Sequence, residues 1–172
     1  ACVKDWDGQG ITLRTCVCFP EVYELGMSYL GTSILYHLAN RRPDALAERC
    51  FAPGDDLYRL LVDANTADMA AGSDPTEPRN IPRDKYDMSA KRTYLWSLES
   101  RRALCDFDAL LFSFTYELSY PQFLRMLDAG GVPLLASERT DDDPIVLAGG
   151  GCTFNPEPIA DFVDAVGIGD AE

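Results

Sequence analysis

The part of the sequence best suited to chemistry is a run of three glycines that follows an apolar segment at 144–148. A turn then leads into 156–162, which we predict as a helix because proline and an acid stand in its first turn. Glycines at the carboxyl end of a parallel strand let a ligand approach the backbone, and open α/β sheets bind their ligands at that edge. The candidate binding residues of this loop are Gly149, Gly150, Gly151, Cys152 and Asn155.

Two more loops carry polar side chains where predicted strands end. In the loop after the first strand, Gly26 is expected to form a positive-φ turn and Ser28 to cap the next helix. Gly31 is expected to let that helix pack tightly on the sheet or to let a bulky ligand approach. The loop after the third strand is rich in hydroxyl groups. We expect the three loops to converge on one site. The candidates from these two loops are Glu21, Tyr23, Gly26, Ser28, Ser113, Thr115 and Tyr116.

The elements that must position these loops alternate between strand and helix patterns. Apolar runs predict strands at 11–19, 47–52, 109–114, 145–148 and 165–168, and a weaker one at 94–98. Helical spacing predicts helices at 28–40, 55–64, 120–129 and 159–162. This alternation predicts a Rossmann-like, doubly wound parallel sheet in three α/β/α layers, with the flavodoxin-like order 2-1-3-4-5. Its switch point lies beside the loops that follow Phe19 and Phe114.

One segment interrupts this regular plan. Residues 67–92 contain a glycine and three prolines among many polar side chains, with no helix or strand periodicity. We predict a polar surface insertion there, within a single domain that spans 1–172.

Charge and cysteine content exclude several classes of function. Fifteen basic and 28 acidic residues give a net charge of −13, which argues against direct binding of nucleic acid or an anionic membrane. No apolar run reaches the roughly 20 residues that span a bilayer, and we expect a cytoplasmic protein. The six cysteines lack paired zinc spacing, and we expect reduced thiols. Cys16 and Cys18 share one strand face and are predicted to lie in the core.

Four motifs together resemble the N-terminal, cobalamin-binding-like domain of uncharacterised radical SAM proteins. They are Pro-Glu-Val-Tyr-Glu-Leu-Gly-Met-Ser-Tyr-Leu-Gly at 20–31, Ser-Leu-Glu-Ser-Arg-Arg at 97–102, Phe-Thr-Tyr-Glu-Leu-Ser-Tyr at 114–120 and Ala-Gly-Gly-Gly-Cys-Thr-Phe-Asn-Pro-Glu-Pro at 148–158. The ending Gly169-Asp170-Ala171-Glu172 is similar to the turn that closes this domain in the family. The resemblance implies an N-terminal piece of a longer enzyme, not itself catalytic. A downstream barrel would bind a 4Fe–4S cluster and S-adenosylmethionine.

The resemblance also implies cobalamin as the cofactor of this domain, without a histidine ligand to cobalt. Glu21-x-Tyr23-x-x-Gly26 keeps the spacing of the Asp-x-His-x-x-Gly motif that supplies a lower axial histidine, but both functional residues differ. A neutral phenol is a poor cobalt ligand, so we expect no metal-ligating residue here. The only histidine, His37, falls inside the first predicted helix.

Two alternatives remain open at this stage. Glycine loops and helix N-termini bind any anion, so the same edge would also suit a flavin or a nucleotide. Alternatively, the domain is a cofactor-free module that docks onto the radical SAM barrel.

Overall fold

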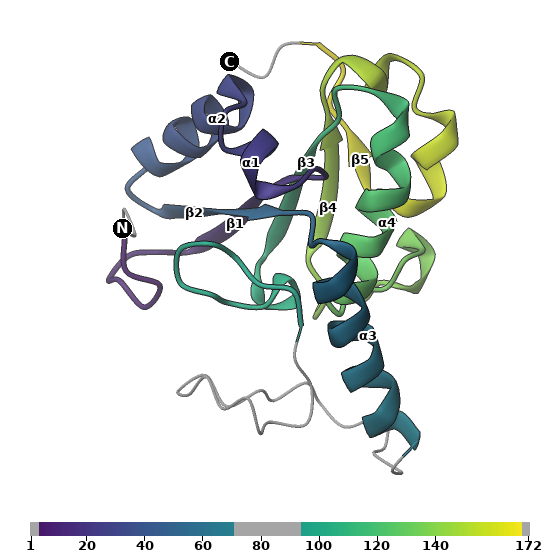
Figure 1. Ribbon diagram of the computed structural model, residues 1–172. Coiled ribbons are helices and arrows are strands. Elements are labelled where there is room, and N and C mark those ends of the chain that lie inside the picture. The colour runs from purple at the N-terminus through teal and green to yellow at the C-terminus, as the bar shows by residue number, and fades with distance from the viewer. Residues whose placement is uncertain (1–3, 71–93, 170–172) are drawn as a thin grey trace.

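The sheet has the predicted topology. The computed structural model describes residues 4–70 and 94–169. Within them, five strands pair in parallel in the order β2-β1-β3-β4-β5, which confirms the flavodoxin-like order (Figure 1). The strands are β1 at Leu13–Phe19, β2 at Ala45–Phe51, β3 at Ala109–Ser113, β4 at Ile145–Gly149 and β5 at Ala165–Val166.

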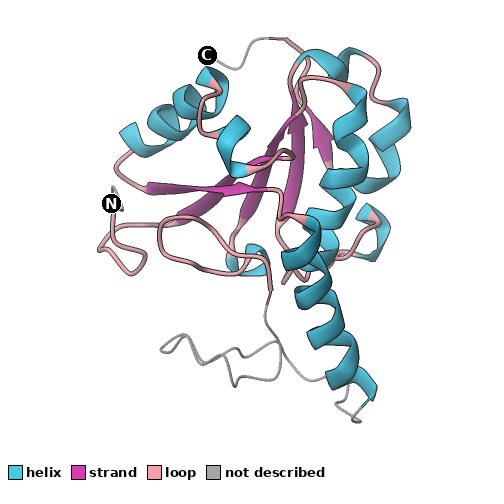
Figure 2. Ribbon diagram, in the orientation of Figure 1, coloured by secondary structure: helices cyan, strands magenta, loops and turns pink. Residues whose placement is uncertain are grey.

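Helices lie on both sides of this sheet, as Figure 2 shows. The α-helices are α1 at Tyr23–Gly26, α2 at Leu30–Arg41, α3 at Asp55–Ala70 and α4 at Tyr120–Ala129. Short 3₁₀ helices occupy Leu104–Asp106, Glu117–Ser119, Ala136–Glu138, Gly151–Phe154 and Glu157–Phe162. The three-layer α/β/α arrangement is therefore confirmed.

The core is divided by the sheet because side chains alternate between its two faces. Cys16 and Cys18 are fully buried on the face that α3 and α4 cover, where Phe123 of α4 joins the same cluster. We call this the α4 face. Val17 points to the opposite side and packs with Tyr36 of α2, so we call that side the α2 face. The prediction that Cys16 and Cys18 are core residues is confirmed, and the cysteines in the described part of the chain are free thiols.

Several element boundaries differ from the prediction. The strand expected at 94–98 is absent, and this segment forms only an isolated antiparallel bridge between Trp96 and Ala103. α3 continues to Ala70, so the first residues of the insertion predicted at 67–92 are helical. The remainder of that insertion lies outside the described residues.

The type of helix predicted after the glycine run is also wrong. Glu157–Phe162 forms a 3₁₀ helix and not an α-helix. The 3₁₀ helix is only six residues long and β5 begins at Ala165, which leaves little chain for the further turns of an α-helix. The loop after β4 therefore has no α-helix N-terminus that would attract a phosphate.

Candidate functional site

The loops after β1, β3 and β4 meet at the carboxyl edge of the sheet, as the sequence predicted. The Tyr116 hydroxyl donates a hydrogen bond to the Glu21 carboxylate, which joins the first loop to the second. The Phe114 amide donates to the Gly149 carbonyl at 2.8 Å, which joins the second to the third. The Ala52 amide also donates to the Glu21 carbonyl at 2.9 Å and fixes the start of the first loop.

In the loop after β1, glycine serves close packing and not a positive-φ turn. Gly26 ends α1 and is absent from the positive-φ residues, so the predicted turn is wrong. A Cβ added there would lie 2.2 Å from the Phe51 ring of β2. Tyr23 packs edge-on against the same ring, with 5.7 Å between ring centroids. α1 can therefore lie on Phe51 only because residue 26 has no side chain.

Ser28 and Gly31 also differ from their predicted roles. Ser28 does not cap α2, because its hydroxyl donates to the Leu25 carbonyl at 2.8 Å. A Cβ on Gly31 would lie 2.6 Å from the Tyr29 ring, so this glycine accommodates its neighbour and not the sheet. The residue that fastens this loop is Thr32, whose buried hydroxyl donates to the Tyr29 carbonyl at 2.8 Å. Sequence reasoning missed Thr32, although a threonine near a helix start is typical of local hydrogen bonds from side chain to backbone.

The three glycines after β4 have unequal surroundings. Gly150 has a φ of 109°, and an added Cβ would lie 2.3 Å from the Phe114 carbonyl oxygen, so the fold requires glycine there. For Gly149 the nearest atom would be 4.0 Å away, and for Gly151 no atom lies within 4 Å. Neither of these two positions has a positive φ. The fold therefore leaves open space at Gly149 and Gly151.

Thr153 holds the glycine loop in place and was missed from the sequence. Its buried hydroxyl donates to the Gly150 carbonyl at 2.7 Å and also lies 3.0 Å from the Gly167 carbonyl. These contacts tie the loop after β4 to the end of β5. The signal available in the sequence was a small hydroxyl residue three positions after a glycine, which is typical of local turn hydrogen bonds.

The remaining candidates of these loops differ in exposure. Ser113 is buried at the end of β3, whereas Thr115, Tyr116 and Asn155 are exposed. The hydrogen bond to Glu21 raises the pKa of the Tyr116 phenol, with further contributions from desolvation and from the carboxylate charge. Partial burial, and then the charge of Glu117, raise the pKa of the Cys152 thiol. Cys152 is therefore a neutral thiol near pH 7 and not an activated nucleophile.

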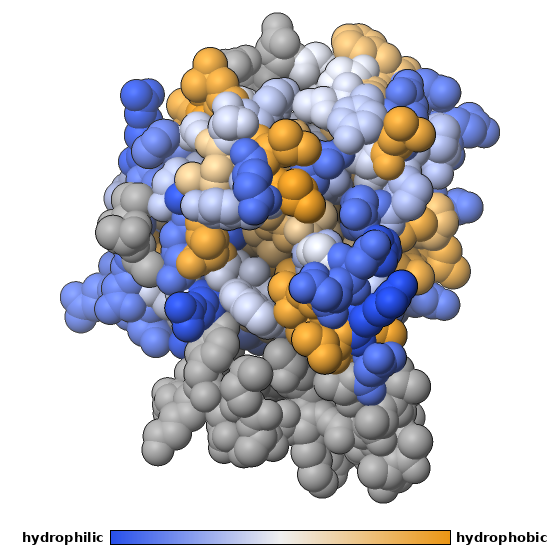
Figure 3. Space-filling view, viewed as in Figure 1, coloured by the Kyte–Doolittle hydropathy of each residue, from blue (hydrophilic) through white to orange (hydrophobic). Residues whose placement is uncertain are grey.

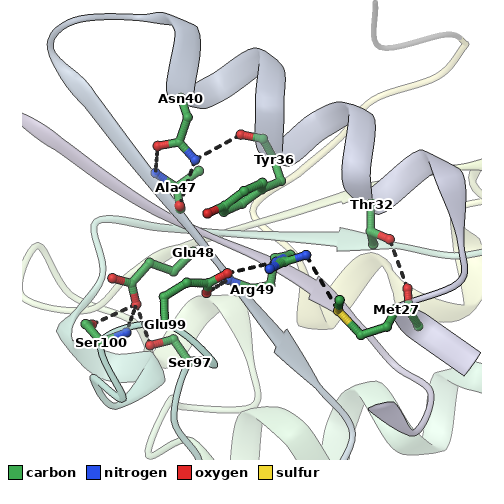
Figure 4. Close-up of polar contacts among 11 residues, drawn as sticks. Met27, Thr32, Tyr36, Asn40, Ala47, Glu48, Arg49, Ser97, Glu99 and Ser100 are labelled. Carbon is green, nitrogen blue, oxygen red and sulfur yellow. Dashed lines mark hydrogen bonds and ion pairs between the residues drawn. The ribbon is translucent and has the colours of Figure 1, made fainter. Parts of the chain in front are cut away.

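The segment at 97–102 supports the loop after β1 from the outer edge of β2 (Figure 4). Glu99 accepts hydrogen bonds from the Arg49 amide at 2.7 Å and from the Arg49 Nε at 2.8 Å. The Arg49 guanidinium lies over the Tyr36 ring, 4.4 Å from its centroid, and its Nη1 lies 3.5 Å from the Met27 sulfur. Arg49 thus connects this segment to α2 and to the loop after β1.

A buried carboxylate anchors the same segment. Oε2 of Glu48 accepts hydrogen bonds from the Ser97 hydroxyl at 2.5 Å and from the Ser100 hydroxyl at 2.7 Å. At the edge of β2, the Glu99 carboxylate accepts from the Arg49 amide and the Leu98 amide donates to the Arg49 carbonyl at 2.7 Å, so backbone groups that would otherwise be unpaired are satisfied.

Large hydrophobic side chains are exposed along the carboxyl edge. Leu30, Leu118 and Phe154 have exposed fractions of 71%, 81% and 72%, and they come from the segments after β1, β3 and β4. Tyr23 and Leu25 of α1 are also exposed. Figure 3 shows hydrophobic patches among the hydrophilic residues of the face it views. An apolar edge of this kind indicates a surface that binds a ligand or another domain.

The described ranges hold neither a cluster of metal ligands nor a helix that could span a membrane. Within 4–70 and 94–169, no three His, Cys, Asp or Glu side chains are grouped as metal ligands. In the same part of the chain, no helix has the length and apolar character needed to cross a membrane.

The fold and the site define a doubly wound parallel α/β domain whose three convergent loops form a candidate binding edge. The family described as radical SAM proteins, N-terminal, matches residues 80–172, which is more than half of the chain. The chain belongs to this family. No curated protein and no solved structure gives a significant match.

Family membership has direct consequences for the whole protein. It implies that the whole protein also has a radical SAM domain, together with the iron–sulfur cluster and the S-adenosylmethionine that such domains use. The matched range contains the loops after β3 and β4, but it excludes the loop after β1.

Proposed function

We propose that residues 1–172 form one module that binds cobalamin at the carboxyl edge of the sheet, for use by the radical SAM domain of the same protein. The observation that carries the proposal is the open space at Gly149 and Gly151, in the loop that a hydrogen bond from Phe114 joins to the loop after β3. Glycine is unnecessary for the fold at these two positions. A group that approaches the backbone closely accounts for them.

The exposed side chains around this edge suit a large, flat ring. Leu118 lies in the loop after β3 and Phe154 in the loop after β4, and both side chains are largely exposed. Their burial against a macrocycle would remove apolar surface from water. When bound, cobalamin supplies a cobalt centre for alkyl transfer or radical chemistry.

The residues present fit cobalamin held without a protein ligand to cobalt. Tyr23 occupies the position at which a histidine would be expected, and its ring packs against Phe51. His37, the only histidine of the sequence, is exposed within α2. Binding would therefore depend on shape, on backbone groups of the glycine loop and on polar contacts from Asn155, Thr115 and the Glu21–Tyr116 pair.

A cofactor-free docking module is the second candidate function. The Glu21–Tyr116 hydrogen bond favours it, because this contact already bridges the loops after β1 and β3. An exposed apolar edge would then pack directly on the radical SAM domain.

A flavin or nucleotide is less favoured because the loop after β4 leads into a 3₁₀ helix and lacks an α-helix N-terminus. The free thiols support our proposal of a reducing, cytoplasmic location.

Titration with hydroxocobalamin tests the proposal. We expect micromolar or tighter binding by the parent chain, measured by absorbance and calorimetry, and at least a tenfold loss in Gly151→Trp. Position 151 has open space and no positive φ, so a large side chain fills the edge without straining the fold. The matched control is Gln9→Trp, which places the same side chain at an exposed position before β1. Circular dichroism checks that all three proteins are folded.

The outcomes separate the candidates. Binding that Gly151→Trp abolishes and Gln9→Trp preserves supports cobalamin at this edge. Equal binding by all three proteins contradicts the site, and no binding by the folded parent favours the docking module. Binding of flavin mononucleotide in place of cobalamin overturns the assignment of cobalamin as the cofactor.

A further inference from the structure

The two faces of the sheet are covered unequally. On the α4 face, Leu110 of β3 and Val146 of β4 are both 0% exposed. On the α2 face, the neighbouring residue of β4, Ile145, is 55% exposed. A parallel sheet normally has both faces buried, because its crossover connections place helices on each side. Part of the α2 face therefore lacks the cover that this architecture requires.

The uncovered area is defined by strand register. Leu111 of β3 pairs with Leu147 of β4, and Leu147 pairs with Ala165 of β5, so these three side chains lie in one row across the sheet. Leu111 and Leu147 are half-buried and Ala165 is exposed. Ile145 lies on the same face two residues before Leu147. We call these four residues the open row.

In the described part of the chain, the cluster that α2 forms on this face reaches the open row only at Leu111. The cluster on this face combines Tyr36, Leu35 and Ala39 of α2 with Val17 and Ala47, which belong to β1 and β2. Leu111 is the member of the open row that packs at the margin of this cluster. α3 and α4 lie on the opposite side (Figure 2). α2 thus covers the β2 and β1 half of its face and leaves the β4 and β5 half uncovered.

The chirality of the connections indicates which segment would cover the row. The connection from β1 runs toward the β2 end of the sheet and carries α2 over the α2 face. β5 is the strand at the other end. A chain that leaves β5 and turns back in that same direction, with the usual right-handed sense, passes over the α2 face. A segment that follows β5 along this path reaches the open row.

We propose that the open row is the docking surface for the polypeptide that follows residue 172 in the same protein, and that this segment packs as an amphipathic helix. The family match supplies the occupant, since an N-terminal domain of a radical SAM protein is continued by further chain toward the radical SAM domain. This proposal depends on family membership and not on cobalamin. It assigns to the linking segment the role of fixing the two domains relative to each other.

Thiol accessibility tests this docking. Ile145→Cys is prepared both in residues 1–172 and in the longer protein that includes the radical SAM domain, and labelling by a maleimide is followed by peptide mass spectrometry. In 1–172, we expect residue 145 to react within about threefold of an exposed Gln9→Cys control. In the longer protein, we expect at least a tenfold slower reaction at 145 and no change at 9. Val146→Cys, on the α4 face, is expected to react slowly in both.

Other results would overturn the proposal. Equal reactivity of residue 145 in both proteins means that the following segment does not cover the row. Slow reaction already in 1–172, with a rate that depends on protein concentration, assigns the row to a second copy of the chain. Circular dichroism confirms folding in each case. None of these results alters the cobalamin titration, so the two proposals fail separately.

Discussion

The loops after β1 and β4 use glycine in different ways. In the first loop, no space is left for a side chain at Gly26, since the Phe51 ring occupies the place where a Cβ would be. In the second, Gly150 is equally constrained, but Gly149 and Gly151 border open space. The comparison separates glycines that the fold requires from glycines that the fold does not explain. Only the latter support a binding site.

Gly150→Ala is expected to have the largest effect on stability. The substitution places a side chain at a φ of 109° and within 2.3 Å of the Phe114 carbonyl oxygen. The backbone cannot move without disturbing β3, so we expect a loss of about 3 kcal/mol or more in unfolding free energy. Urea denaturation measures this loss in unfolding free energy. Gly151→Ala is the matched control, and a similar loss there would remove the distinction between the glycines.

Thr153→Val is expected to lower the stability by about 2 kcal/mol. Valine keeps the shape but removes the hydroxyl of a buried residue that donates to the Gly150 and Gly167 carbonyls. Thr153→Ser retains the donor and should recover most of the loss. If Val and Ser have equal effects in thermal denaturation, the hydrogen bonds do not hold the glycine loop.

Gly26→Ala is expected to destabilise the domain by about 1 kcal/mol. Overlap with the Phe51 ring costs more than the gain in helix propensity, but a ring at the edge of the sheet can shift. Phe51→Leu should reduce the cost of the alanine, and a double-mutant cycle by urea denaturation measures this coupling. Additive effects would show that Gly26 is not constrained by Phe51.

Glu21→Gln is expected to have the smallest effect, a lowering of the Tyr116 pKa toward its ordinary value of about 10. Because the folded-state pKa is raised, this contact stabilises the fold below about pH 10 and is lost as the phenol ionises at higher pH. NMR titration of ¹³C-labelled tyrosine, assigned with Tyr116→Phe, measures the pKa. An unchanged value in Glu21→Gln would mean that the two loops are not joined by this bond in solution.

The sequence predicted the sheet well because its strands are mostly apolar segments bounded by proline, glycine and polar residues. The convergence of three loops followed from parallel topology, which places all carboxyl ends at one edge. The roles of Gly26 and Ser28 could not be predicted, because they depend on Phe51 and on the Leu25 carbonyl, whose positions are set by tertiary packing. The open row was equally hidden, since Ile145 and Val146 are alike in sequence and differ only in which face they occupy.

A crystal structure of residues 1–172 grown with saturating hydroxocobalamin tests the central claim most directly. The account predicts a corrin ring against Gly149 and Gly151, between the exposed side chains of Leu118 and Phe154, with no protein side chain on cobalt. A domain that crystallises with this edge empty, or with cobalamin bound elsewhere, would contradict it.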